Sequence, residues 1–86
     1  MSKDVTFNNR DRLIQLGIAI STIRKQRGLS QEELAEKAKI SRSLLSSIEA
    51  PGIAKSFSLD NFFTIADALE IKPSVLISAS DFLSDT

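Results

Sequence analysis

Three serines divide the middle of this chain into short helices, and this division constrains the fold more than any other feature of the sequence. Ser30 and Glu33 form a capping box, in which each side chain accepts a hydrogen bond from the backbone of the other residue. Ser41 and Ser58 stand at similar helix starts, and Gly28 is placed to end the helix that precedes Ser30. The predicted elements are five short helices without a sheet: about 10–27, 31–38, 42–50, one that begins after Ser58, and one that begins near Pro73.

The apolar residues of the first and fourth predicted helices are spaced to form one buried stripe on each helix. They are Leu13, Leu16, Ile20 and Ile23 in the first helix, and Leu59, Phe62, Ile65, Ala66 and Leu69 in the fourth. Gly17 interrupts the first helix at a cost of about 1 kcal/mol, and we interpret it as a site of close packing. Residues 1–86 are therefore expected to form one all-α domain, a five-helix bundle with flexible ends at about 1–8 and 79–86.

Two absent residue types exclude most enzymes and metal sites. The 86 residues include no cysteine and no histidine, so disulfides and zinc–thiolate sites are excluded and the commonest general base is missing. The sequence contains no phosphate-cradling glycine motif and no nucleophile motif, and it indicates no cofactor and no small-molecule ligand. The longest apolar runs are too short to span a membrane, and the N-terminus lacks a secretory signal. These features predict a cytoplasmic protein that is not an enzyme.

The charges are balanced in sum but unevenly distributed along the chain. Residues 1–57 carry a formal charge of +4, and residues 58–86 carry −4. A neutral chain with this distribution can present one basic end to the phosphates of a nucleic acid. A chance distribution of solvated charges is the alternative interpretation.

The third predicted helix has one apolar face and one face of short polar residues. At about 100° per residue, Leu45 and Ile48 share the apolar face. The opposite face carries Arg42, Ser43, Ser46 and Ser47. Serine is a poorer helix former than the Glu, Lys and Gln of an ordinary solvated face, and arginine can bond bidentately to guanine. The face is therefore interpreted as a contact surface for DNA, with a merely tolerated surface as the alternative.

Two segments of the chain, residues 23–35 and 40–49, resemble the Cro/CI (XRE) phage-repressor family of helix-turn-helix transcriptional regulators. The similarity extends from about Ile20 to Leu76. The positions that carry it are Gln31, Leu34, Ala35, Ala38, Ile40, Leu45 and Ile48, where the family pattern has glutamine, alanine or core apolar residues.

The resemblance implies a lambda-repressor-like fold in which residues 30–49 read double-stranded DNA and the third helix lies in the major groove. It implies base contacts by Arg42, Ser43 and Ser47, with Ser46 and Leu44 at the margins. It also implies a phosphate contact by Gln31 and a structural pair of Arg24 and Glu49. The alternatives are an ordinary first helical residue for Gln31 and two independently solvated charges for the pair.

Two departures from the family pattern affect these expectations. Lys39 stands at the turn position usually held by glycine, so it is expected to adopt a positive φ and to add a charge near the DNA backbone. The loop that follows Glu49 is longer than in compact phage repressors, and its one charge is Lys55. Lys39 and Lys55 are the further candidates for phosphate contacts.

The expected function is transcriptional regulation, in the simplest case repression by occupying a promoter. The main alternative is a protein-interaction module of the same fold, such as an antitoxin-like partner subunit, which would use the acidic C-terminal portion. Ile14 and Ile18 lie off the core stripe of their helix, and Phe82 and Leu83 lie beyond the fifth helix. These four residues suggest a second apolar surface, which is covered either by the tail folding back over Ile14 and Ile18 or by a partner subunit. Because paired reading helices can use successive major grooves, we expect a homodimer that uses the fifth helix, the tail or both.

Overall fold

The computed structural model describes the backbone of residues 2–84 and the side chains of residues 9–81. Within residues 2–84 the chain forms five helices and no strand: α1 (Ser2–Gln26), α2 (Gln31–Ala38), α3 (Arg42–Glu49), α4 (Leu59–Ala68) and α5 (Pro73–Ser84). The expected all-α fold is thus confirmed. No helix in this part of the chain is both long enough and apolar enough to cross a lipid bilayer.

The helix starts predicted from the three serines are confirmed. The Ser30 hydroxyl accepts a hydrogen bond from the Glu33 N–H at 3.0 Å, and the Glu33 carboxylate accepts one from the Ser30 N–H at 2.8 Å. The bond from the Ser30 backbone holds the pKa of Glu33 below its ordinary value, because the bond favours the charged carboxylate. Ser41 and Ser58 cap α3 and α4 in the same way, through bonds of 3.0 and 3.1 Å to the third helical N–H. Gly28 ends α1 with a φ of +74°, as predicted.

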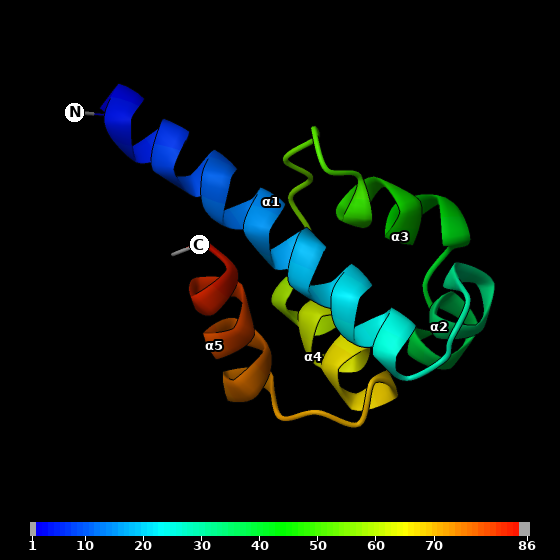
Figure 1. Cartoon of the computed structure of the whole chain (residues 1–86). Helices are drawn as coiled ribbons and strands as arrows, with labels where there is room; N and C mark the ends of the chain where they lie inside the picture. Colours follow the sequence, from blue (N-terminus) through cyan, green and yellow to red (C-terminus); the bar gives the residue numbers. More distant parts are fainter. Residues whose placement is uncertain (1, 85–86) are drawn as a thin grey trace.

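The core lies between α1 and the other four helices, and each helix contributes to it. α1 makes its most extensive contact with α5 and also packs on α3, while α2 packs on both α3 and α4. The largest fully buried side chains are Ile20, Leu34, Leu45, Ile48, Ile65, Leu69 and Leu76. Figure 1 shows that α3 lies on one side of α1, with α4 and α5 on the other.

Gly17 lies where α1 crosses the end of α3. A Cβ atom at this position would overlap the carbonyl oxygen of Ile48. The close packing predicted from the sequence is therefore present, and it fixes how near α1 and α3 approach each other.

The first and last helices are longer than predicted. α1 begins at Ser2 instead of about residue 10, because no proline or glycine interrupts the chain before Gly17. α5 continues through residues 79–84, where a frayed tail was expected. Packing stabilises this extension. Ala79, three residues after the buried Leu76, is half-buried, and Ser80, four residues after it, is buried.

Leu59 was assigned to the core from its spacing, and this prediction is wrong. Its side chain is 69% exposed, because Leu59 is the first residue of α4 and lies a turn before the packed part of that helix. Ile14 and Ile18, which were expected on a second apolar surface, are half-buried. The side chains of Phe82 and Leu83, assigned to the same surface, lie outside the described residues.

Candidate nucleic-acid interface

The turn between α2 and α3 is closed by backbone hydrogen bonds around a left-handed residue. Lys39 has φ and ψ of 59° and 41°, which confirms the prediction of a positive φ. The N–H of Ile40 donates to the Ala35 carbonyl at 3.0 Å, and the N–H of Lys39 donates to that of Glu36 at 3.2 Å. Since these bonds satisfy the last carbonyls of α2, the chain can turn at once into the capped start of α3. The two helices are thereby held at a fixed angle.

The exposed face of α3 carries the residues predicted to read bases. Arg42, Ser43 and Ser46 are exposed, and Ser47 is half-buried. On the other side of the helix Leu45 and Ile48 are buried, and the half-buried Leu44 packs against the core. The face predicted from the helical periodicity is therefore present, and it holds one long cationic side chain among hydroxyl groups.

A buried hydrogen-bond network ties α3 to the two preceding helices. The Nε and Nη2 atoms of Arg24 donate to the two carboxylate oxygens of Glu49 at 2.8 and 3.0 Å. The Nη1 atom of Arg24 donates to the Leu29 carbonyl at 2.8 Å, and Nε2 of Gln31 donates to Oε1 of Glu49 at 2.9 Å. Arg24 is 8% exposed and Glu49 7%, so solvent screens this pair only weakly. The pairing of Arg24 with Glu49 is confirmed.

Two observations in this region did not follow from the sequence. The bond from Gln31 to Glu49 spans 18 residues and depends on the tertiary packing, so no local pattern signals it. Arg27 directly follows the last residue of α1, and no local pattern signals its partner either. Its Nε donates to the Leu69 carbonyl at 2.8 Å and thus binds the end of α4, which is 42 residues away in the sequence.

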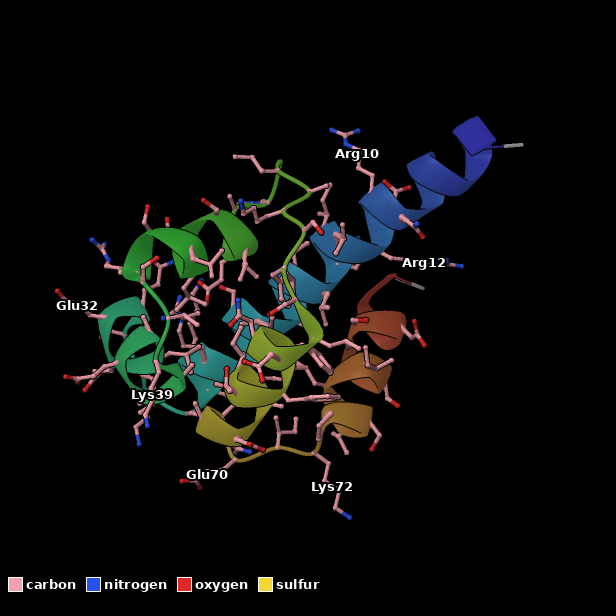
Figure 2. All side chains as sticks on the ribbon, turned by 180° about the vertical axis from the view of Figure 1, so that it is seen from behind. Arg10, Arg12, Glu32, Lys39, Glu70 and Lys72 are labelled. Carbon is pink, nitrogen blue, oxygen red and sulfur yellow. The ribbon has the colours of Figure 1, made fainter. Side chains whose placement is uncertain are left out.

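The structure separates the three predicted phosphate contacts. Gln31 is the first residue of α2, so it stands at a helix N-terminus, where the first backbone N–H groups have no partner within the helix. Lys55 is exposed in the loop of residues 50–58, which follows α3. Lys39 is also exposed, but Figure 2 shows its side chain pointing away from α3. The structure therefore does not bring Lys39 to the exposed face of α3.

Carboxylates surround the outer side of α2. Arg42 lines a shallow hollow between α2 and α3 together with Glu32, Glu33 and Glu36. Figure 2 shows Glu32 pointing outward from α2. These carboxylates would repel the phosphates of a nucleic acid. The exposed face of α3 carries no carboxylate, because Glu49, the one acid of that helix, is buried.

Comparisons with known proteins agree with this geometry. Residues 20–76 match the helix-turn-helix family. The chain is 37% identical over 70 residues to the immunity repressor protein of Bacillus phage phi105, and the match covers 81% of this chain and 47% of the relative. This chain thus spans about half the length of that relative.

Solved structures with a similar fold include two regulators. The restriction-modification controller protein C.AhdI from Aeromonas hydrophila is 34% identical, with a TM-score of 0.69 over 74% of this chain and 94% of that chain. The clp gene regulator ClgR from Corynebacterium glutamicum is 27% identical, with a TM-score of 0.73 over 83% of this chain and 72% of that chain.

The family match covers more than half of the chain, and it includes the capped start of α2, the turn at Lys39 and the exposed face of α3. The similarity to a phage immunity repressor points to one type within the family. The chain therefore belongs to the helix-turn-helix family, of the Cro/CI phage-repressor type.

Proposed function

We propose that this protein is a transcriptional regulator that binds specific double-stranded DNA with α3 in the major groove. The observation that carries the proposal is the exposed face of α3, where Arg42 stands among serines on a helix that a buried network holds in place. Short hydroxyl groups let the helix approach base edges closely, and the arginine can bond bidentately to guanine. The base contacts in this proposal are Arg42, Ser43, Ser46 and Ser47.

Phosphate contacts position the helix in the groove. We assign them to Gln31, at the N-terminus of α2, and to Lys55, in the loop after α3. The Nε2 atom of Gln31 has a second N–H, so it can bind a phosphate while it remains bonded to Glu49. Lys39 is left out of this interface, because its side chain points away from α3 (Figure 2).

Repression by occupying a promoter is the regulatory mode that we propose. It is supported by the similarity to a phage immunity repressor, and it requires only that bound protein block a promoter. We also propose that the protein acts as a homodimer, since two reading helices about 34 Å apart can enter successive major grooves. A single unit with few phosphate contacts would bind weakly at physiological salt.

Selection of bound sites from a random pool of DNA duplexes tests the proposal. The expected result is a palindromic consensus with one guanine position in each half-site that depends on Arg42. Arg42→Ala should lower discrimination at that position by about 1–3 kcal/mol and leave the rest of the consensus unchanged. Lys72→Ala is the matched control, because it removes the same charge from an exposed residue between α4 and α5 (Figure 2).

Two outcomes would overturn these assignments. If Arg42→Ala weakens binding to all sequences equally, Arg42 is a phosphate contact and not a base contact. If the wild-type protein selects no sequence and shifts no duplex at any salt concentration, DNA binding is wrong, and a protein-interaction module of the same fold becomes the better assignment.

A further inference from the structure

We propose that Arg10, in the projecting N-terminal half of α1, binds the phosphate backbone of DNA beside the segment that α3 reads. This inference rests on the proposed function and adds a contact from a helix outside the helix-turn-helix unit. The partner is the phosphate backbone itself, so the contact would not depend on base sequence.

The register of α1 places Arg10 on the side that faces the end of α3. Arg10 precedes Gly17 by seven residues, which is two helical turns, so the two residues share a face to within about 20°. Gly17 lies against the carbonyl of Ile48. At about 1.5 Å per residue, Arg10 stands about 10 Å further along α1, beyond the end of α3.

The loop after α3 borders the same position. Arg10 lines an open hollow of about 540 Å³ together with Asn9 and Leu13 of α1 and residues 52–54 of the loop. Among the residues whose side chains the structure describes, Arg10 is the one charged residue that lines it, and no carboxylate does so. An anion in this hollow would therefore meet a guanidinium group without a competing acid, and arginine binds phosphate oxygens through two parallel N–H groups.

The guanidinium of Arg10 is available for such a contact. Arg10 is exposed, and among the residues whose side chains are described it has no hydrogen bond or ion pair. The neighbouring acid, Asp11, lies about 100° further around the helix. Arg10 can therefore bind a new partner without breaking an interaction with any residue from 9 to 81.

The figures place the N-terminal half of α1, and with it Arg10, on the side of the molecule where the loop after α3 lies. In Figure 1 the N-terminal half of α1, the loop and α3 follow one another along one side, and α5 lies on the other. In Figure 2 Arg10 points to the side where the loop rises, and Arg12 points away from it. A duplex that lies along α3 and passes the loop would next meet Arg10.

Arg12 supplies a matched control on the same helix. It lies about 200° from Arg10, is also exposed, and borders a different hollow, which is lined by Ile77, Ser80 and Asp81 of α5. Arg10→Ala and Arg12→Ala remove the same charge from the same part of α1. A difference between them therefore reports position and not net charge.

The experiment measures the dependence of DNA affinity on salt for the full chain, with its selected duplex and with an unrelated duplex of the same length. Each phosphate contact contributes about 0.9 to the slope of log K against log salt concentration. Arg10→Ala is expected to lower the slope by about 1 for each subunit bound and to lower the affinity for both duplexes by the same factor. Arg10→Lys should restore most of the slope, and Arg12→Ala should leave it unchanged. Thermal melting of each variant establishes that it is folded.

The outcomes separate this inference from the proposed function. If the wild-type protein binds its selected duplex and Arg10→Ala keeps the wild-type slope, the Arg10 contact is wrong and the proposed function stands. If Arg10→Ala and Arg12→Ala lower the slope equally, the effect is one of overall charge and the contact is again wrong. If the wild-type protein binds no duplex, the proposed function itself fails.

Discussion

At Gly17 the backbone of α3 leaves no space for a side chain. A substitution there would stabilise α1 as a helix but destabilise its packing on α3. Alanine would favour the helix by about 1 kcal/mol, but its Cβ would overlap the Ile48 carbonyl oxygen, a backbone atom that cannot rotate away. Overpacking of this kind costs about 1–3 kcal/mol. We expect Gly17→Ala to lower the free energy of unfolding in urea melts. Gly52→Ala, whose Cβ would meet no atom within 4 Å, should leave it nearly unchanged. Equal stability of the two variants would contradict the close approach of α1 and α3.

The pair of Arg24 and Glu49 should show energetic coupling. Removal of either partner leaves a buried charge without its partner, which costs about 3–5 kcal/mol. Arg24→Ala and Glu49→Ala are each expected to lower the melting temperature, and the double variant should be more stable than the sum of the two losses predicts. Gln31→Ala should have a smaller effect, since Glu49 keeps both bonds from Arg24. Strict additivity of the two charge removals would show that the side chains do not interact in solution.

At the scale of single residues, the sequence predicted the outward face of α3 and the pair of Arg24 and Glu49, because helical periodicity and the family resemblance locate both. The bond of Gln31 to Glu49, the bond of Arg27 to the end of α4 and the position of Arg10 beside the loop could not be predicted. Each depends on how two helices that are distant in sequence pack against each other.

At the scale of elements, the ends of helices were predicted where a side chain or a glycine bonds to the backbone. Ser30, Ser41 and Ser58 start helices, and Gly28 ends one, as their local chemistry dictates. The start of α1 and the end of α5 were predicted wrongly, since neither carries such a signal and packing stabilises the last turns of α5. The spacing of apolar residues also placed Leu59 in the buried stripe of α4, whereas its side chain is exposed.

The turn between α2 and α3 holds Lys39 in the left-handed region, and glycine should relieve the resulting strain. This conformation destabilises the folded state by roughly 1–2 kcal/mol when the residue has a Cβ. Glycine removes this strain, but it also increases the entropy of the unfolded chain, which offsets part of the stability gained. We therefore expect Lys39→Gly to raise the free energy of unfolding by about 0.5–1 kcal/mol. Lys37→Gly, inside α2, removes the same charge from an ordinary helical position and should lower it by about 1 kcal/mol. A loss of stability in Lys39→Gly would contradict the left-handed turn.

At the scale of the whole molecule, the proposed homodimer would use apolar side chains that α5 exposes. Val75 and Ile77 of α5 are 47% and 44% exposed. We expect sedimentation equilibrium to show a dimer, and Val75→Ser combined with Ile77→Ser to shift it toward monomer. Leu59→Ser combined with Phe63→Ser removes a larger exposed apolar area from α4 and should leave the dimer intact. A chain that remains monomeric at all concentrations, and that binds a single non-palindromic site, would contradict the dimer.

The packing of α1 against α5 sets the order in which the chain can fold during synthesis. Of the five helices α1 is made before the others, yet its most extensive contact is with α5, which is made after them. Until α5 emerges, this side of α1 stays exposed to water or to chaperones, although α2, the turn and α3 have already been synthesised. A stall in translation before α5 would therefore leave a nascent chain that contains the complete reading unit on an unfinished core.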